Sequence, residues 1–346
     1  MGSPIFNAPG LCYNKDMYNK SGASVMTFKF FLLAVVLLIV VTAAILFGSV
    51  WIPPTDLIHS PLLRMRLTRV LAGALVGAGL SVSGTVFQAI LRNPLADPYV
   101  LGVSSGAGLG AALTMAAGLG LWAAWTISAG AFLGALLSIG FVYFIARERS
   151  GAVHVYTLLL TGVMYSAFAS AGLMIVFIMA PNERLPGILW QLLGSLQIYD
   201  SRLLWISGTV IAVGIIGAAL TAPALNPMIL GDDKAHSLGV DANRTRLTAF
   251  VLASLIAGAC VSLCGLIGFV GLAAPHISRC LFGQDYRRLV PASVLTGATL
   301  LIAADLMARS LPLTGAIAAE APVGIVTALI GAPFFLVIMS RRKTSS

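Results

Sequence analysis

Long apolar runs alternate with short polar breaks along almost the whole chain. A helix needs about 20 apolar residues to cross a hydrocarbon core of roughly 30 Å, and about ten stretches of the sequence suit that length. They lie near 28–50, 67–91, 98–118, 122–146, 155–180, 203–222, 246–267, 266–283, 289–310 and 322–340. The pattern predicts an all-α integral membrane protein with about ten transmembrane helices. The window 266–283 fits least well, because it is short and contains His276 and Arg279.

Two polar segments lie outside these windows. Residues 1–26 lack the small-residue cleavage site of a secretory signal, so we expect a disordered cytoplasmic leader followed by a retained helix. The remainder, 27–346, is then a single transmembrane domain. Residues 181–202 have an amphipathic pattern too short to cross the membrane, and we expect a helix lying over the outer mouth of the bundle.

The loop 222–245 is long and rich in helix-capping residues. We expect two short helices in it, the second capped by Asp232 or Asp233 and ended by Gly239. Asp241 is placed to cap the span that follows. The loop is therefore either an ordinary polar connector or a rigid lever that a motor protein could engage.

Composition and charge agree with a membrane protein. Of the 346 residues 58% are apolar and 10% are charged. The net charge of +9 does not indicate nucleic-acid binding, because the basic residues are scattered among short loops. If the N-terminus is cytoplasmic, 15 of the 21 Lys and Arg residues lie on the cytoplasmic side. The positive-inside rule then predicts that both termini are cytoplasmic.

Six arginines fall on the opposite side, and three of them share the stretch RMRLTR. The six are Arg64, Arg66, Arg69, Arg184, Arg202 and Arg309. Such side chains can be tolerated by reaching the lipid headgroups. Alternatively, they form a docking surface for carboxylates of an extracytoplasmic partner.

An internal repeat links the two halves of the chain. The segment VGAGLSVSG (76–84) aligns with AGACVSLCG (257–265) at an offset of 181, and the same offset carries Pro94 onto Pro275. The second span and the seventh span run in opposite directions, so the two units, spans 2–5 and 7–10, have inverted topology. Inverted repeats are typical of transporters, with the pathway between the halves.

The sequence contains little that could perform chemistry. No GxxxxGK[ST] nucleotide motif occurs, and no acidic residue lies at the centre of a predicted span. Asp97 before Pro98 is expected to cap the third span, Asp305 to pair locally, and Glu320 to cap an outer helix. We therefore expect neither an enzyme nor bound ATP in this chain.

Metal binding is not indicated either. Cys260 and Cys264 stand four apart within a span and lack the spacing of a metal site, so we interpret them as packing residues. His276 lies beside Pro275, where a hydrogen-bonded structural role is the simpler interpretation. We expect no metal site.

Several long motifs, in order, resemble the FecCD family of permease subunits. They are RLTRVLAGALVGAGLSVSGTVFQAILRNPLADPYVLGVSSGAGLGA (66–111), GDDKAHSLGV (231–240), GFVGLAAPHISRCLFGQDYRR (268–288), ADLMAR (304–309) and APVGIVTALIGAPFFLVIM (321–339). The family's usual RLPR reads RLTR here, and its Glu-Leu-Pro reads Glu-Ala-Pro at 320–322. Neither departure removes a charge.

The resemblance implies a BtuC-like permease domain in a bacterial inner membrane that imports haem, cobalamin or a ferric siderophore. Its partners would be a second copy of the chain, two cytoplasmic ATPase subunits that hold ATP and Mg²⁺, an extracytoplasmic binding protein and the lipid bilayer, with no nucleic acid. No residue distinguishes one cargo from another.

The resemblance also implies roles for particular residues. By this resemblance, the residues that dock the binding protein are Arg66, Arg69 and Arg309. The residues that couple to the ATPase are Asn226, Gly231, Ala235, Leu238 and Gly239. A cytoplasmic gate comprises Ser150, Gly151, His154, Val155 and Tyr156, and the scaffold motifs contain Asn93, Pro94, Asp97, Pro98, Pro275 and His276.

Other classes of membrane protein fit less well. A self-contained secondary transporter or channel would also use inverted repeats, but it would need mid-span acids to couple ions. An integral-membrane enzyme would need a cluster of His, Asp, Glu or Ser residues. The sequence offers neither feature, so an importer subunit with ATP hydrolysed on a partner chain is the prediction.

Overall fold

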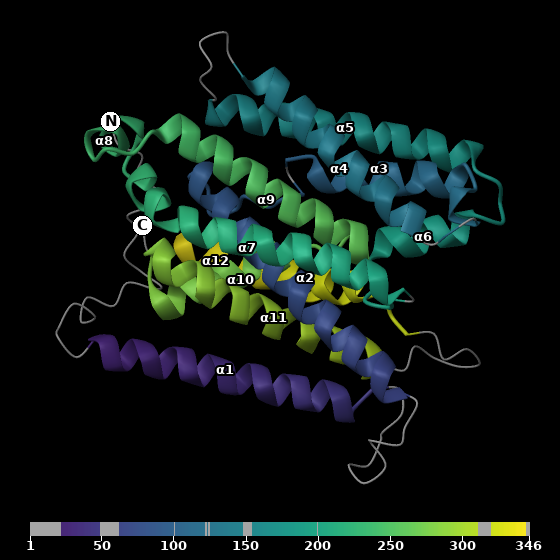
Figure 1. Cartoon of the computed structure of the whole chain (residues 1–346), viewed down its shortest axis with the longest axis horizontal. Coiled ribbons are helices and arrows are strands. Elements are labelled where there is room, and N and C mark those ends of the chain that lie inside the picture. The colour runs from purple at the N-terminus through teal and green to yellow at the C-terminus, as the bar shows by residue number, and fades with distance from the viewer. Residues whose placement is uncertain are drawn as a thin grey trace.

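A computed structural model describes residues 22–48, 62–99, 101–121, 123, 125–147, 154–198, 200–310 and 320–343. These residues form a bundle of helices joined by short connections (Figure 1). The elements are α1 (Gly22–Leu46), α2 (Leu62–Ile90), α3 (Val103–Ala116), the 3-10 turn η3 (Leu119–Leu121), α4 (Trp125–Ala146), α5 (Val155–Met179), α6 (Leu185–Leu193), α7 (Ser201–Ile229), α8 (Asp232–Ser237), α9 (Ala242–Cys264), α10 (Val270–Phe282), α11 (Tyr286–Ser310) and α12 (Val323–Lys343).

Each predicted span contains one helix. Within the described ranges, seven helices are long and apolar enough to cross a membrane: α1, α2, α4, α5, α7, α9 and α11. The helices α3 and α10 are shorter, with 14 and 13 residues. The shortness of α10 explains why the window 266–283 fitted the pattern poorly. The nine-residue α6 is the short helix expected within 181–202. The first helix begins at Gly22, inside the segment expected to be a leader, whereas residues 1–21 lie outside the described part of the chain.

The helix contacts reproduce the internal repeat. Helix α2 packs against α11 and α10, just as α9 packs against α4 and α3. Helix α3 contacts α4 and α5, just as α10 contacts α11 and α12. Exchanging α2–α5 for α9–α12 therefore preserves these contacts, with the α2–α9 contact at the centre. This correspondence confirms the predicted pairing of the second to fifth spans with the seventh to tenth.

The connector after α2 corrects one capping prediction. Asp97 does not cap a helix that starts at Pro98; its Oδ1 accepts a hydrogen bond from the Tyr99 N–H at 2.9 Å. Upstream, the Asn93 Oδ1 accepts from the Leu95 N–H at the same distance. These side-chain turns compete with helix formation. Helix α3 begins only after Gly102, whose positive φ of 80° suits glycine.

The end of α7 corrects a second prediction. Residues 222–229 do not form a separate short helix, because α7 continues through Pro223 and Pro227 to Ile229. A proline inside a helix removes one backbone donor and costs stability. Burial of Leu225 and Met228 against the core offsets that cost.

Glycine permits direct contact between the backbones of the central helices. A Cβ on Gly84 of α2 would lie 1.9 Å from the Gly271 oxygen of α10. A Cβ on Gly77 would lie 2.3 Å from the Gly297 oxygen of α11. Small residues at such crossings let helices pack tightly in a membrane. The close packing of α2, from the first repeat, against α10 and α11, from the second repeat, therefore depends on these glycines.

Replacing Gly84 with Ala should strongly lower the melting temperature of the purified protein in detergent, because the new methyl group meets backbone that cannot move aside. Overpacking of this kind costs about 1–3 kcal/mol or more. The matched control is Gly140→Ala, where nothing lies within 4 Å of the added Cβ. Equal melting temperatures for the two variants would contradict the packing argument.

Candidate functional site

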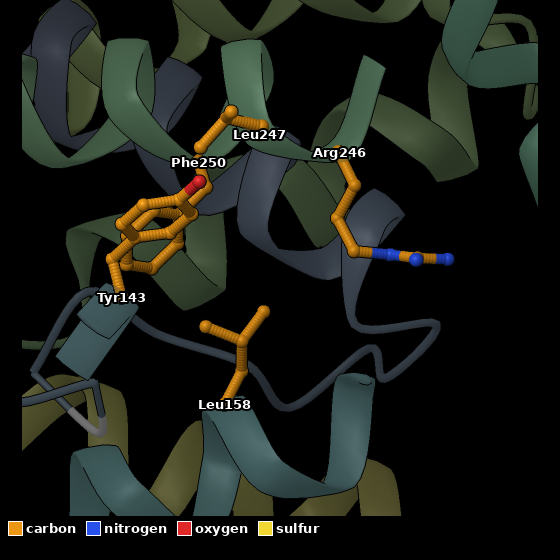
Figure 2. A pocket seen from close by; sticks show the side chains of 5 residues that line it. All are labelled: Tyr143, Leu158, Arg246, Leu247 and Phe250. Carbon is orange, nitrogen blue, oxygen red and sulfur yellow. The ribbon is translucent and has the colours of Figure 1, made fainter. Parts of the chain in front are cut away.

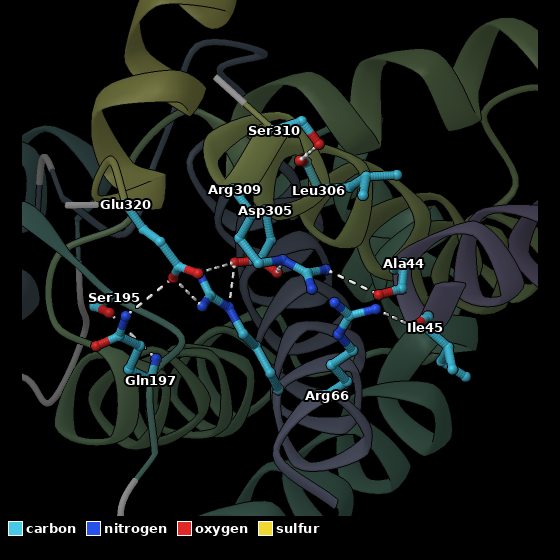
Figure 3. A network of polar contacts seen from close by, with 11 residues as sticks. Ala44, Ile45, Arg66, Ser195, Gln197, Asp305, Leu306, Arg309, Ser310 and Glu320 are labelled. Atoms are coloured by element: carbon cyan, nitrogen blue, oxygen red, sulfur yellow. Dashed lines mark hydrogen bonds and ion pairs between the residues drawn. The ribbon is translucent and has the colours of Figure 1, made fainter. Parts of the chain in front are cut away.

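A buried carboxylate joins two arginines where α2 begins and α11 ends. Asp305 Oδ1 lies 2.8 Å from Nη2 of Arg69, and Asp305 Oδ2 lies 3.0 Å from Nε of Arg309 (Figure 3). Arg69 also pairs with Glu320, which accepts a further hydrogen bond from the Gln197 amide at 3.0 Å. We call Arg66, Arg69, Asp305, Arg309 and Glu320 the charged cluster.

The charged cluster also holds the end of α1. Arg66 Nη1 donates to the carbonyl oxygens of Ile45 and Leu46 at 2.7 and 3.0 Å. Arg309 Nη2 donates to the carbonyl oxygen of Ala44 at 3.2 Å. The last carbonyls of a helix lack partners within it and carry partial negative charge, so cations stabilise them. Two arginines therefore fasten α1 to the bundle.

Burial separates the members of the charged cluster. Arg66 is 7% exposed and Arg309 is 6% exposed, whereas Arg64 is an exposed residue. The Arg69 and Glu320 side chains retain 12% and 22% of their exposure. Partial burial acts to raise the pKa of Glu320, but the hydrogen bond and charge of Arg69 lower it overall. The Arg69–Glu320 pair is thus the part of the cluster most open to a partner.

The structure brings together the three arginines expected to dock a partner, but it gives them internal counter-ions. Local pairing of Asp305 is confirmed, and the i,i+4 spacing of Asp305 and Arg309 could have identified that pair. Glu320 was expected to cap a helix; instead it pairs with Arg69 across 251 positions of sequence. No local sequence signal could have revealed that contact.

The opposite end of the bundle carries α8. Gly231 and Gly239 flank this helix with positive φ values of 115° and 80°. Gly239 thus ends the short helix as predicted, in the left-handed conformation that favours glycine. Asp241 Oδ1 accepts from the N–H groups of Asn243 and Arg244 at 3.0 Å, which confirms the predicted cap of α9. In Figure 1, α8 lies at the left end of the bundle, where α7 ends and α9 begins.

The five residues expected to couple to a motor differ in exposure. Leu238 is 62% exposed and Ala235 is fully buried. Asn226 faces inward, where its Nδ2 donates to Asp285 at 2.8 Å and its Oδ1 accepts from the Tyr286 N–H at 3.0 Å. Leu238 is therefore an apolar side chain that a partner could reach, while Gly231 and Gly239 shape the backbone on either side of α8.

Sequence reasoning missed a second carboxylate held by two arginines. Asp232, at the start of α8, pairs with Arg92 after α2 and with Arg246 of α9. In Figure 2 the Arg246 guanidinium points away from Phe250 and Leu158. Tyr143, Leu158, Leu247 and Phe250 line a small pocket together with Arg246, whose side chain is 5% exposed.

The expected gate residues are only partly described. Ser150 and Gly151 lie outside the described residues. His154 precedes α5, Val155 begins it, and Tyr156 is 87% exposed.

Two scaffold residues of α10 lie within its helix. Pro275 is buried, and the His276 ring lies 6.3 Å and 6.2 Å from the ring centroids of Phe334 and Phe335 on α12. Among the residues that the structure describes, no three His, Cys, Asp or Glu side chains are grouped to hold a metal ion.

The bundle is an inverted repeat that contains membrane-length helices. It has the charged cluster at one end and the ion pairs of Asp232 at the other. These features are those of a multi-pass membrane transport protein. The chain belongs to the FecCD transport family, whose sequence profile matches residues 34–341. It is 38% identical over 285 residues to an uncharacterized ABC transporter permease protein, YvrB of Bacillus subtilis, covering 81% of this chain and 79% of that one.

Two further relatives have named cargoes. The cobalamin import permease BtuC of Halobacterium salinarum is 41% identical, covering 81% of this chain and 73% of its own. The hemin transport permease HmuU of Yersinia pestis is 37% identical, covering 86% and 88%. A solved inward-facing structure described as a metal-chelate type ABC transporter is 30% identical, with a TM-score of 0.81, and covers 91% of this chain and 99% of that one. The chain is thus a permease subunit of an ABC importer.

Replacing Asp305 with Asn should destabilise the protein by about 3–5 kcal/mol, because the buried guanidinium of Arg309 and the largely buried guanidinium of Arg69 lose their shared counter-ion. The measurement is thermal unfolding of the purified protein in detergent. Glu183→Gln, which removes an exposed carboxylate, is the control and should change stability by less than about 0.5 kcal/mol. If Asp305→Asn unfolds at the temperature of the control, the cluster does not hold the helices together.

Proposed function

We propose that this chain forms the membrane path of an ATP-driven importer for a metal chelate such as haem, cobalamin or a ferric siderophore. Two copies would line the path, two ATPase subunits would lie beneath them, and a binding protein would deliver the cargo from outside. The observation that carries the proposal is the inverted-repeat bundle with the charged cluster at one end and α8 at the other. The cargo class rests on the names of the relatives.

Asp305 argues against ion-driven transport. It is the one acidic residue within the seven described helices of membrane length, and Arg69 and Arg309 hold it. An acid that relays protons must be able to gain and lose its charge within the membrane, and an acid that couples another cation must be free to bind it. Asp305 instead holds α2 and α11 together through its two arginine partners. The driving force for transport would therefore come from a partner subunit.

The distribution of basic residues orients the chain. With both termini cytoplasmic, α8 faces the cytoplasm and the charged cluster faces outward. Leu238 would then enter the ATPase, and the charged cluster would meet the binding protein. In this orientation each proposed contact would lie on the side of its proposed partner.

Docking then proceeds by exchange of carboxylates. Arg66 and Arg309 are covered by the chain's own atoms, and Arg69 is already paired with Glu320. A glutamate of the binding protein would therefore replace Glu320 on Arg69. Charge-assisted pairs of arginine with carboxylate have the strength and geometry for such recognition.

Replacing Glu320 with Gln should tighten docking of the cognate binding protein about fivefold, because it removes the competing carboxylate from a partly exposed ion pair worth about 1 kcal/mol. Arg69→Gln should weaken docking. The measurement is binding of the purified binding protein to the complex in nanodiscs. Arg64→Gln is the control, since Arg64 is exposed at the same end of α2. Weaker docking of Glu320→Gln, at unchanged melting temperature, would contradict the exchange.

Replacing Leu238 with Asp should lower ATP-driven uptake at least about tenfold, because an unpaired carboxylate would be buried against the ATPase at a cost of about 1–3 kcal/mol or more. The measurement is uptake of cyanocobalamin, haemin or ferric citrate into proteoliposomes that contain the whole complex. Leu238→Met keeps an apolar side chain and should retain uptake. Wild-type uptake by Leu238→Asp would overturn the assignment of Leu238 to coupling.

A further inference from the structure

Asp232 connects α8 to both halves of the inverted repeat. The Arg246 Nη2 donates to both carboxylate oxygens of Asp232 at 2.8 Å, and Arg246 belongs to α9 of the second repeat. Arg92 donates to Asp232 Oδ1 and follows α2 of the first repeat. One carboxylate therefore links α8 to the adjacent helix α9 and to the end of α2, which lies 140 residues away in sequence.

Arg92 reaches a further helix through a constrained backbone. Its Nε donates to the carbonyl oxygen of Met228, near the end of α7, at 2.8 Å. Its φ is 48°, in the left-handed region that a non-glycine residue adopts only when its surroundings hold it there. The link between α2 and α8 is thus fixed at the Arg92 backbone as well as at its guanidinium.

The charges of this site favour an ionised Asp232. Partial burial acts to raise the pKa of Asp232, but the hydrogen bond and charge of Arg246 and the charge of Arg92 lower it overall. The carboxylate retains half of its exposure, whereas the Arg246 side chain is almost fully buried. Arg246 is therefore the rigid side of the contact, and α8 is the side that a partner can reach.

The same contact borders the expected gate. His154, the residue immediately before α5, lines an open cavity of about 490 Å³ together with Asp232 and Arg246. Asp233, His236 and Asp241 complete the acidic and imidazole part of the lining. A displacement of α8 would thus change the wall of a cavity that reaches the start of α5.

We propose that Asp232 is the positioning residue that transmits movement of α8 to both repeats at once. This inference rests on the proposed coupling of α8 to an ATPase. A helix of six residues cannot act as a lever unless it is fastened to what it moves. Its connections to α9 through Arg246 and to α2 through Arg92 provide that fastening.

The variant Asp232→Asn keeps the size of the side chain but removes its charge. In proteoliposomes that contain the whole complex, it should leave the ATPase bound and hydrolysing ATP while uptake per ATP falls at least fivefold. Asp232→Glu should restore at least half of the coupling. Glu183→Gln is the control, because it removes an exposed carboxylate that lies before α6, outside this site, and should leave uptake per ATP unchanged.

Single replacements of the arginines separate the two links. Arg92→Gln should disconnect the first repeat and Arg246→Gln the second, and each should lower uptake per ATP. Adding either to Asp232→Asn should cause little further loss, because the shared contact is already broken. Fully additive losses, or unchanged uptake per ATP in Asp232→Asn, would overturn the proposal.

The outcomes also separate this inference from the proposed function. If the wild-type complex transports none of cyanocobalamin, haemin and ferric citrate, the proposed cargo class fails. If Asp232→Asn loses the ATPase altogether in a pull-down, Asp232 holds α8 in shape for binding and does not transmit movement. Only retained hydrolysis with reduced uptake supports a transmitting role.

Discussion

The ion pair of Asp305 with Arg69 and Arg309 is the contact on which one end of this bundle depends, where α2 begins and α11 ends. Asp305 and Arg309 lie on α11, Arg69 lies on α2, and these helices belong to different repeats. A buried charge is costly unless it is paired, so the three side chains require one another. Through Arg66 and Arg309 the same cluster holds α1, and through Glu320 it reaches the start of α12.

The opposite end repeats this arrangement with different residues. Asp232 lies between Arg92 and Arg246, as Asp305 lies between Arg69 and Arg309. In both places one carboxylate joins a residue of the first repeat to a residue of the second. Between the two ends, α2 packs against α10 and α11 through glycines, and no ion pair is needed there.

Much of this architecture follows from local patterns in the sequence. The spans, the short helix α6, the cap at Asp241 and the stop at Gly239 follow from hydrophobic periodicity and capping chemistry. The repeat could be recognised because Gly84 and Gly265 occupy matched positions.

The predictions that were wrong, and the contacts that were missed, also have physical explanations. Asp97 forms a turn instead of a helix cap, and α7 continues through Pro223 and Pro227, because tertiary packing overrides local preference. The partners of Arg69 and Arg92 lie far away in sequence, at separations of 236, 251 and 140 residues, where a single sequence carries no signal.

The central claim is that the charged cluster faces the outside and α8 faces the cytoplasm. The most direct measurement is labelling of single cysteines by a membrane-impermeant maleimide, in a background without the four native cysteines. Arg64→Cys, at an exposed position beside the cluster, should react in intact spheroplasts. Leu238→Cys, at a position that is 62% exposed, should react only after the membrane is permeabilised. Labelling of Leu238→Cys in intact cells, with Arg64→Cys protected, would contradict the account.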